Sequence, residues 1–82
     1  MYQDMDEPID VMVLFQKNRM RPLRFLWKDR TYKISEVTGD WITDVGAYRV
    51  RHFAVVDGSS NFFQLSYDER KTTWAISKIW VE

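Results

Sequence analysis

The stretch Leu23-Arg24-Phe25-Leu26-Trp27-Lys28-Asp29-Arg30-Thr31-Tyr32-Lys33-Ile34 decides the fold class of this 82-residue chain. Leu23, Phe25 and Trp27 occupy alternate positions, and Tyr32 and Ile34 resume the alternation after a charged tripeptide at residues 28–30. Because successive side chains of a strand point to opposite faces of a sheet, this period of two predicts two strands joined by a tight turn. The stretch therefore predicts a β-hairpin whose aromatic rings face a core.

Runs of the same kind lie on both sides of this hairpin, at residues 9–15, 47–56, 63–67 and 72–81. Asp57-Gly58-Ser59-Ser60-Asn61 is the strongest turn signal of the chain. The apolar alternation changes phase near Ser35-Glu36, near His52 and around Lys78, which predicts β-bulges and bent strands. We therefore predict an all-β fold, a strongly bent antiparallel meander of about five to six strands that forms an SH3-like or small partly open barrel.

The length allows one domain, and its composition limits how that domain is stabilised. The chain has no cysteine and a single histidine, so we expect neither a disulfide nor a metal site, and no cofactor. Four Trp, four Tyr and five Phe supply large rings for a thin core instead. We expect residues 1–8 to be a flexible acidic N-terminus ending at Pro8, and residues 9–82 to be a single small β-barrel-like domain. Residues 9–15 allow either a strand or a short helix, because Met12 and Leu14 are also apolar.

The chain shows no pattern of a targeting or membrane segment. The N-terminal residues are acidic where a signal peptide is basic, and the longest apolar run, residues 11–15, is far too short to cross a bilayer. We therefore expect a bacterial-type cytoplasmic protein without membrane contact.

The residue types that carry out catalysis are scarce. The serines lie in no nucleophile-elbow pattern, and the three glycines form no phosphate-binding loop. Paired carboxylates at Asp40 with Asp44, and at Asp68 with Glu69, fall in predicted turns, where exposed acids are ordinary. We therefore expect a protein that is not an enzyme.

The net charge is zero, but the charges are segregated along the chain. Residues 1–10 carry four acidic residues and no basic one, whereas residues 17–33 carry seven basic residues against Asp29 alone, a local sum of +6. This asymmetry predicts either an anion-binding surface or an acidic N-terminus that folds over a basic strand.

Several polar and aromatic side chains point away from the predicted core rows and are candidates for binding. In the predicted phasing they are Arg24, Lys33, Arg49, Arg51, Phe62, Gln64 and Trp80. On neighbouring strands they would form a basic stripe with stacking rings, which is how small barrels bind single-stranded nucleic acid. An ordinary solvated face is the alternative. His52, between two arginines and Phe53, fits a polar bulge residue better than a phosphate ligand.

The sequence is also compatible with a binding module for a protein partner or for a second copy of itself. We place this function first, through an edge strand at residues 9–15 or an aromatic face, because unpaired strand edges accept an added strand. Single-stranded nucleic-acid binding, linked to DNA repair, is the alternative.

A family resemblance rests on strand motifs between residues 22 and 81. These are Pro22-Leu23-Arg24-Phe25-Leu26-Trp27, Tyr32-Lys33-Ile34-Ser35-Glu36-Val37, Trp41, Tyr48-Arg49-Val50, Phe63-Gln64-Leu65-Ser66-Tyr67 and Trp74-Ala75-Ile76. This pattern resembles a family of short bacterial domains of unknown function that are often encoded near translesion DNA-synthesis genes. The resemblance implies no catalytic residues, and its gene neighbourhood favours a DNA-related role.

Overall fold

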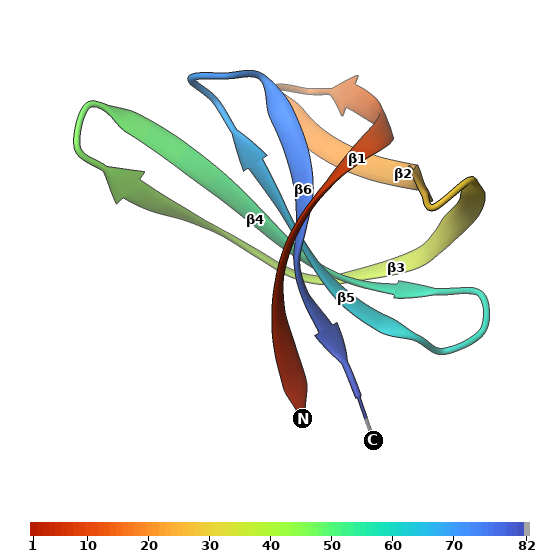
Figure 1. Ribbon diagram of the computed structural model, residues 1–82. Helices are drawn as coiled ribbons and strands as arrows, with labels where there is room; N and C mark the ends of the chain where they lie inside the picture. Colours follow the sequence, from red (N-terminus) through yellow and green to blue (C-terminus); the bar gives the residue numbers. More distant parts are fainter. Residues whose placement is uncertain (82) are drawn as a thin grey trace.

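A computed structural model describes residues 1–81, which form six antiparallel strands (Figure 1). They are β1 (Tyr2–Gln16), β2 (Arg19–Trp27), β3 (Arg30–Val45), β4 (Tyr48–Asp57), β5 (Phe62–Asp68) and β6 (Thr73–Trp80). Each strand pairs with the next along the chain, and β6 pairs with β1, so the strands form a ring. The prediction of an all-β, strongly bent antiparallel meander is confirmed. Within residues 1–81 there is no helix of the length and apolarity needed to cross a membrane.

The two longest strands change partners along their length. Residues 2–9 of β1 pair with β6, whereas residues 10–16 pair with β2. Residues 30–33 of β3 pair with β2, whereas residues 34–45 pair with β4. The ring therefore consists of a large sheet of β3, β4, β5, β6 and the start of β1, and a small sheet of the end of β1, β2 and the start of β3. Both β1 and β3 belong to the two sheets at once.

Irregularities in the pairing lie where two of the three predicted phase changes fall. The register of β3 on β4 shifts between Ile34 and Glu36, and that of β5 on β6 shifts at Gln64, which leaves Ser77 as an extra residue next to Lys78. The predicted bulge at His52 is wrong, because β4 pairs regularly with both neighbours at that residue. The change in apolar alternation near His52 instead reflects the position of the β3–β4 hairpin. The β3–β4 hairpin extends away from the ring (Figure 1), so neither of its faces has to be uniformly apolar.

The core lies between the two sheets and is built around aromatic rings. The buried apolar residues are Ile9, Phe25, Phe53, Val55, Phe63, Leu65 and Ile76. Phe25 stacks on Tyr32 with ring centroids 5.0 Å apart, and both rings meet the edge or face of Phe63 at 5.2 and 5.4 Å. Trp41 and Trp80 remain exposed. The aromatic hairpin at residues 23–34 therefore supplies much of the core, as its alternation predicts.

The acidic N-terminal segment is part of the ring, which corrects the expectation that residues 1–8 are a flexible lead-in. Strand β1 begins at Tyr2, and the backbone of Met1 exchanges two hydrogen bonds with Val81 at 2.7 and 3.1 Å. The inward positions of this segment are occupied by Met5, which packs on the core, and by Glu7, which accepts a hydrogen bond from the Trp27 indole. With only one apolar inward side chain, the segment lacks the alternation that predicts a strand.

The first two connections are tight turns made of residues with positive φ. Only Lys17 and Asn18 form the turn between β1 and β2, with φ of 52° and 62°, and β2 begins at Arg19. The tight turn predicted at residues 28–30 is present, with Lys28 and Asp29 at φ of 52° and 60°. Strand β2 thus passes through Pro22, which pairs with Val13 beside a register shift. A proline is accepted there because β2 has no partner on its other side at that point.

We expect Glu7→Ala to destabilise the protein by about 1–2 kcal/mol, because it leaves the half-buried Trp27 indole N–H without its acceptor. Urea unfolding followed by tryptophan fluorescence measures this. Asp6→Ala, at an exposed position of the same segment, is the matched control and should change stability by less than about 0.5 kcal/mol. Equal effects of the two substitutions would show that the segment does not depend on the indole contact.

The β4–β5 turn depends on the carboxylate of Asp57, which is buried. Its Oδ1 accepts the backbone N–H groups of Ser59 and Asn61, both at 2.9 Å, and its Oδ2 accepts the Asn61 side-chain amide at 3.0 Å. Burial by itself raises the pKa of Asp57, but these hydrogen bonds, together with the charge of Arg30, hold it below its ordinary value of 3.8. The ionised carboxylate therefore stabilises the fold.

Because the pKa of Asp57 is lower in the folded than in the unfolded chain, its contribution is complete above the ordinary value of 3.8 and is lost as the pH falls through the folded value. We expect Asp57→Asn to cost about 1–2 kcal/mol at neutral pH, since its amide nitrogen cannot accept from Asn61. Urea unfolding at neutral pH and at progressively lower pH should show this difference shrinking in acid. A difference that stays constant across the acid range would contradict the assignment.

Candidate functional site

Strands β2 and β3 separate from one another and leave two strand edges face to face. They pair only from Arg24 with Lys33 to Trp27 with Arg30. Before this stretch β2 pairs only with β1, and after it β3 pairs only with β4. Within residues 1–81, the sides of β2 and β3 that face each other beyond this stretch therefore carry no ladder partner.

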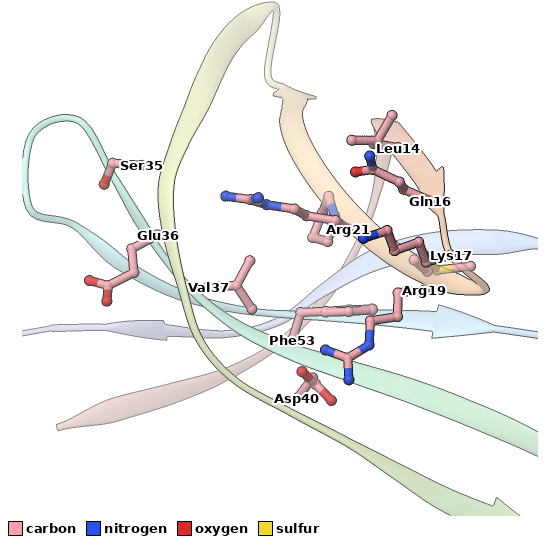
Figure 2. A pocket seen from close by; sticks show the side chains of 12 residues that line it. Leu14, Gln16, Lys17, Arg19, Arg21, Ser35, Glu36, Val37, Asp40 and Phe53 are labelled. Atoms are coloured by element: carbon pink, nitrogen blue, oxygen red, sulfur yellow. The ribbon is translucent and has the colours of Figure 1, made fainter.

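The space between these edges is a cleft of about 670 Å³ (Figure 2). Its lining comes from the β1–β2 hairpin, the middle of β3 and one residue of β4: Leu14, Gln16, Lys17, Arg19, Met20, Arg21, Pro22, Ser35, Glu36, Val37, Asp40 and Phe53. A second cavity of about 320 Å³ continues it along the β3–β4 hairpin toward Trp41, Ile42 and His52. The two share Arg19, Met20, Asp40 and Phe53, so they form one groove, which we call the β2–β3 groove.

The floor of the β2–β3 groove is apolar. Phe53 and Pro22 are buried, and Met20 and Val37 pack against the core from the two walls. These four side chains are inward-facing members of β2, β3 and β4, so the strand alternation that builds the core also builds the floor. An extended chain lying here would therefore cover apolar surface on one of its faces.

The two walls carry opposite charge. Lys17, Arg19 and Arg21 come from the β1–β2 hairpin, whereas Glu36 and Asp40 come from β3. Figure 2 shows Arg21 extending from β2 toward β3, and Arg19 pointing toward the end of the cleft where Asp40 lies. None of the three ion pairs recorded within 4 Å for residues 1–81 involves any of these five residues. Their charges are therefore available to a ligand.

The length of the groove suits a segment of extended chain. Along β3 its lining runs from Ser35 to Ile42. At about 3.3 Å per residue, these eight positions span about 26 Å. That is the length of an extended peptide of about eight residues.

The seven binding residues proposed from the sequence do not form one stripe. Arg24 and Lys33 are direct cross-strand partners on the small sheet. Arg49 and Arg51 lie on the β3–β4 hairpin, where Arg49 pairs with Asp44 at 3.6 Å and Arg51 with Glu69 at 2.6 Å. Of the seven, Arg51 alone lines the β2–β3 groove.

The three remaining candidates lie together on the large sheet. Gln64 is paired with Lys78, and continuing that register by two residues sets Phe62 opposite Trp80. Trp80 meets the Tyr2 ring edge-on at 5.2 Å. The structure thus separates the predicted set into three groups on three parts of the surface.

The contacts of His52 are those of a side chain that stabilises the hairpin, and not those of an anion-binding residue. Its ring stacks on Trp41 at 5.3 Å, and its Nε2 lies 2.9 Å from the hydroxyl of Thr43. Burial lowers the pKa of His52, which favours the neutral imidazole at pH 7. A neutral ring attracts a phosphate less, so these observations favour the polar structural role.

The acidic N-terminus lies mainly along β6 and not over the basic segment at residues 17–33, although Glu7 contacts Trp27. Its first half pairs with β6, and Asp4 lies 3.4 Å from Lys78 of that strand. None of the three ion pairs of residues 1–81 joins the acidic N-terminus to residues 17–33, so the anion-binding explanation is the better supported of the two. The cations of the groove wall belong to the +6 segment that the sequence singles out, but their position opposite Glu36 and Asp40 depends on the separation of β2 and β3.

The edge strand expected at residues 9–15 is present in part. Residues 10–16 pair with β2 on one side and have no ladder partner on the other within the described chain. The edges of β2 and β3 differ from it because they face one another across an apolar floor. The sequence analysis did not predict these two facing edges or the groove between them.

Comparison with known proteins adds a family assignment. A family model described as "Domain of unknown function (DUF6504)" matches residues 1–81. Searches of curated proteins and of solved structures found no match. The chain, with its ring of six strands and its groove between β2 and β3, belongs to the DUF6504 family.

Proposed function

We propose that this protein is a non-enzymatic binding module that takes an extended segment of a protein partner into the β2–β3 groove as an added strand. The observation that carries the proposal is the pair of unpartnered strand edges that face each other over an apolar floor. Backbone groups on such edges retain free donors and acceptors, and strand addition is a common way to satisfy them.

The arrangement of the groove defines the segment that fits. Alternate side chains would rest on Met20, Val37 and Phe53, while the intervening ones would point outward between the charged walls. The cations on the β2 side favour acidic residues facing β2, and Glu36 and Asp40 favour basic residues facing β3. The partner segment is therefore about eight residues of alternating apolar and charged character.

Single-stranded nucleic acid is supported less well as the ligand. Phosphates along the groove would meet Glu36 and Asp40 on one wall. Arg49 and Arg51, which the nucleic-acid hypothesis needs, are already paired with carboxylates. The resemblance to bacterial domains supports placing the module in a bacterial cytoplasm. Its partner could then be a protein of DNA repair, in line with the gene neighbourhood of the family that the sequence resembles.

The proposal is tested by selecting peptides from a displayed random library on the purified protein and titrating the best of them. We expect amide resonances of residues 19–23 and 35–42 to shift, and their hydrogen exchange to slow, because the peptide supplies the missing ladder. Arg21→Glu should weaken binding by about tenfold or more, since it reverses a wall charge. Lys71→Glu, at an exposed turn on another part of the chain, should leave binding unchanged.

A backbone-modified peptide separates strand addition from side-chain contact alone. In an added strand, alternate peptide residues direct their N–H groups toward the same wall of the groove. Methylating those amide nitrogens of the peptide should abolish binding, because the hydrogen bonds to that wall can no longer form. Methylating the remaining amide nitrogens, which point toward the opposite wall, should be tolerated only if the peptide pairs with one of the two strands and not with both. Undiminished binding of both modified peptides would rule out strand addition. Oligothymidine binding that shifts the same amides would favour the nucleic-acid hypothesis instead.

A further inference from the structure

The outer face of the small sheet exposes apolar side chains beside a row of cations. Met12, Leu14 and Leu26 are 53, 41 and 42 % exposed, although outward positions of a half-buried antiparallel sheet are usually polar. The cations are Arg21, Arg24 and Lys33. This face is the outer surface of the same strands whose inner surface carries the Phe25 and Tyr32 stack.

The strand register sets the geometry of this face. Met12 of β1 lies opposite Arg24 of β2, which lies opposite Lys33 of β3. One row along, Leu14 lies opposite Arg21. In these two rows the β1 positions are apolar and the β2 and β3 positions are basic, so an apolar column runs beside a basic one.

The next row along the sheet departs from this pattern, because β1 supplies Asp10 there and the apolar side chain comes from β2. In that row Leu26 lies opposite Asp10 and Thr31, and a shallow hollow of about 360 Å³ lies between Asp10, Met12, Arg24 and Leu26. The three ion pairs within 4 Å in the described chain include none of Arg21, Arg24 and Lys33. The cations of this face therefore have no acidic partner at that distance among residues 1–81.

We propose that this face docks an acidic amphipathic helix of a protein partner. Leucine-type side chains on one stripe of the helix would cover Met12, Leu14 and Leu26, and glutamate or aspartate residues beside that stripe would face Arg21, Arg24 and Lys33. Alternate residues of β1 are about 6.6 Å apart, close to the spacing of helix positions i and i+4, so successive turns of a helix match the column. Met12 adds a flexible side chain that adapts to the shape of an apolar partner.

Other occupants fit this face less well. A second copy of the chain would bring identical cation rows together, which is repulsive. Single-stranded nucleic acid would be attracted by the cations, but the exposed side chains of these rows offer no aromatic ring for base stacking. An added strand would pair along the free edge of β1 and not lie on this face, because β2 has ladder partners on both sides around Arg24 and Leu26.

This site is independent of the β2–β3 groove except at Leu14 and Arg21, which border both. The test therefore uses Met12, Arg24, Leu26 and Lys33, which do not line the groove. The probe is a synthetic amphipathic helical peptide with leucines on one stripe and glutamates on its flanks. A second peptide has lysine at every glutamate position.

Titrations by calorimetry and amide shifts give the decisive readings. We expect the acidic peptide to shift resonances of residues 10–14, 24–26 and 31–33 and to bind more weakly as salt is added. Arg24→Glu and Lys33→Glu should each weaken it by about tenfold, and the double variant should bind the lysine peptide in its place. Lys71→Glu is the control for a change of net charge alone.

Apolar contact is tested separately with Leu26→Ser and Met12→Ser, whose exposure makes them compatible with folding. Each should weaken the acidic peptide by about tenfold, whereas Phe62→Ser, of similar exposure on the large sheet, should have no effect. Shifts confined to the groove, no binding of the acidic peptide, competition by oligothymidine, or a dimer in sedimentation that Met12→Ser dissociates would each overturn the proposal. Peptides selected for the groove should bind the Arg24→Glu variant normally, so the two proposals fail independently.

Discussion

The change of pairing partner within β1 and β3 is the constraint on which the rest of the structure depends. Six strands close into a ring only if two of them bend enough to belong to both sheets, and register shifts at residues 12–13 of β1 and 34–36 of β3 lie near these changes. Once β3 turns away from β2 after Lys33, β2 loses one partner and β3 gains another. The β2–β3 groove is therefore a consequence of closing the ring with so few strands.

The same constraint explains how a small chain without cysteine is stabilised. The two sheets enclose a few large rings, and the stacked pair Phe25 and Tyr32 with Phe63 forms a continuous aromatic cluster across the interior. The ends of the ring are closed by polar contacts: the Trp27 indole with Glu7, and the backbone of Met1 with Val81. The Trp27 ring packs against the core while its N–H donates to Glu7, so hydrophobic burial and this hydrogen bond stabilise the same side chain.

The charge distribution follows from the topology as well. The acidic start of β1 pairs with β6, where Asp4 lies near Lys78. The basic residues of β2 lie beside the second half of β1, which belongs to the small sheet. The inner edge of β2 consequently faces the groove and its outer face presents cations beside Met12 and Leu26. Two surfaces with distinct geometry, a groove between facing strand edges and an amphipathic sheet face, thus share strand β2. The strand-addition and helix-docking proposals both depend on this strand.

The sequence by itself determined the all-β class, the aromatic hairpin at residues 23–34, the turn at Asp57 and the bend near Ser35-Glu36, because alternation, turn residues and phase changes are local signals. It did not reveal the strand at residues 2–8, whose inward positions include Glu7, nor the regular pairing at His52. Only the tertiary structure decided which strands lose a partner, and so where the groove lies and which cations border it. Strand pairing joins residues far apart in the chain, and a period of two says which face a side chain takes but not which strand lies beside it.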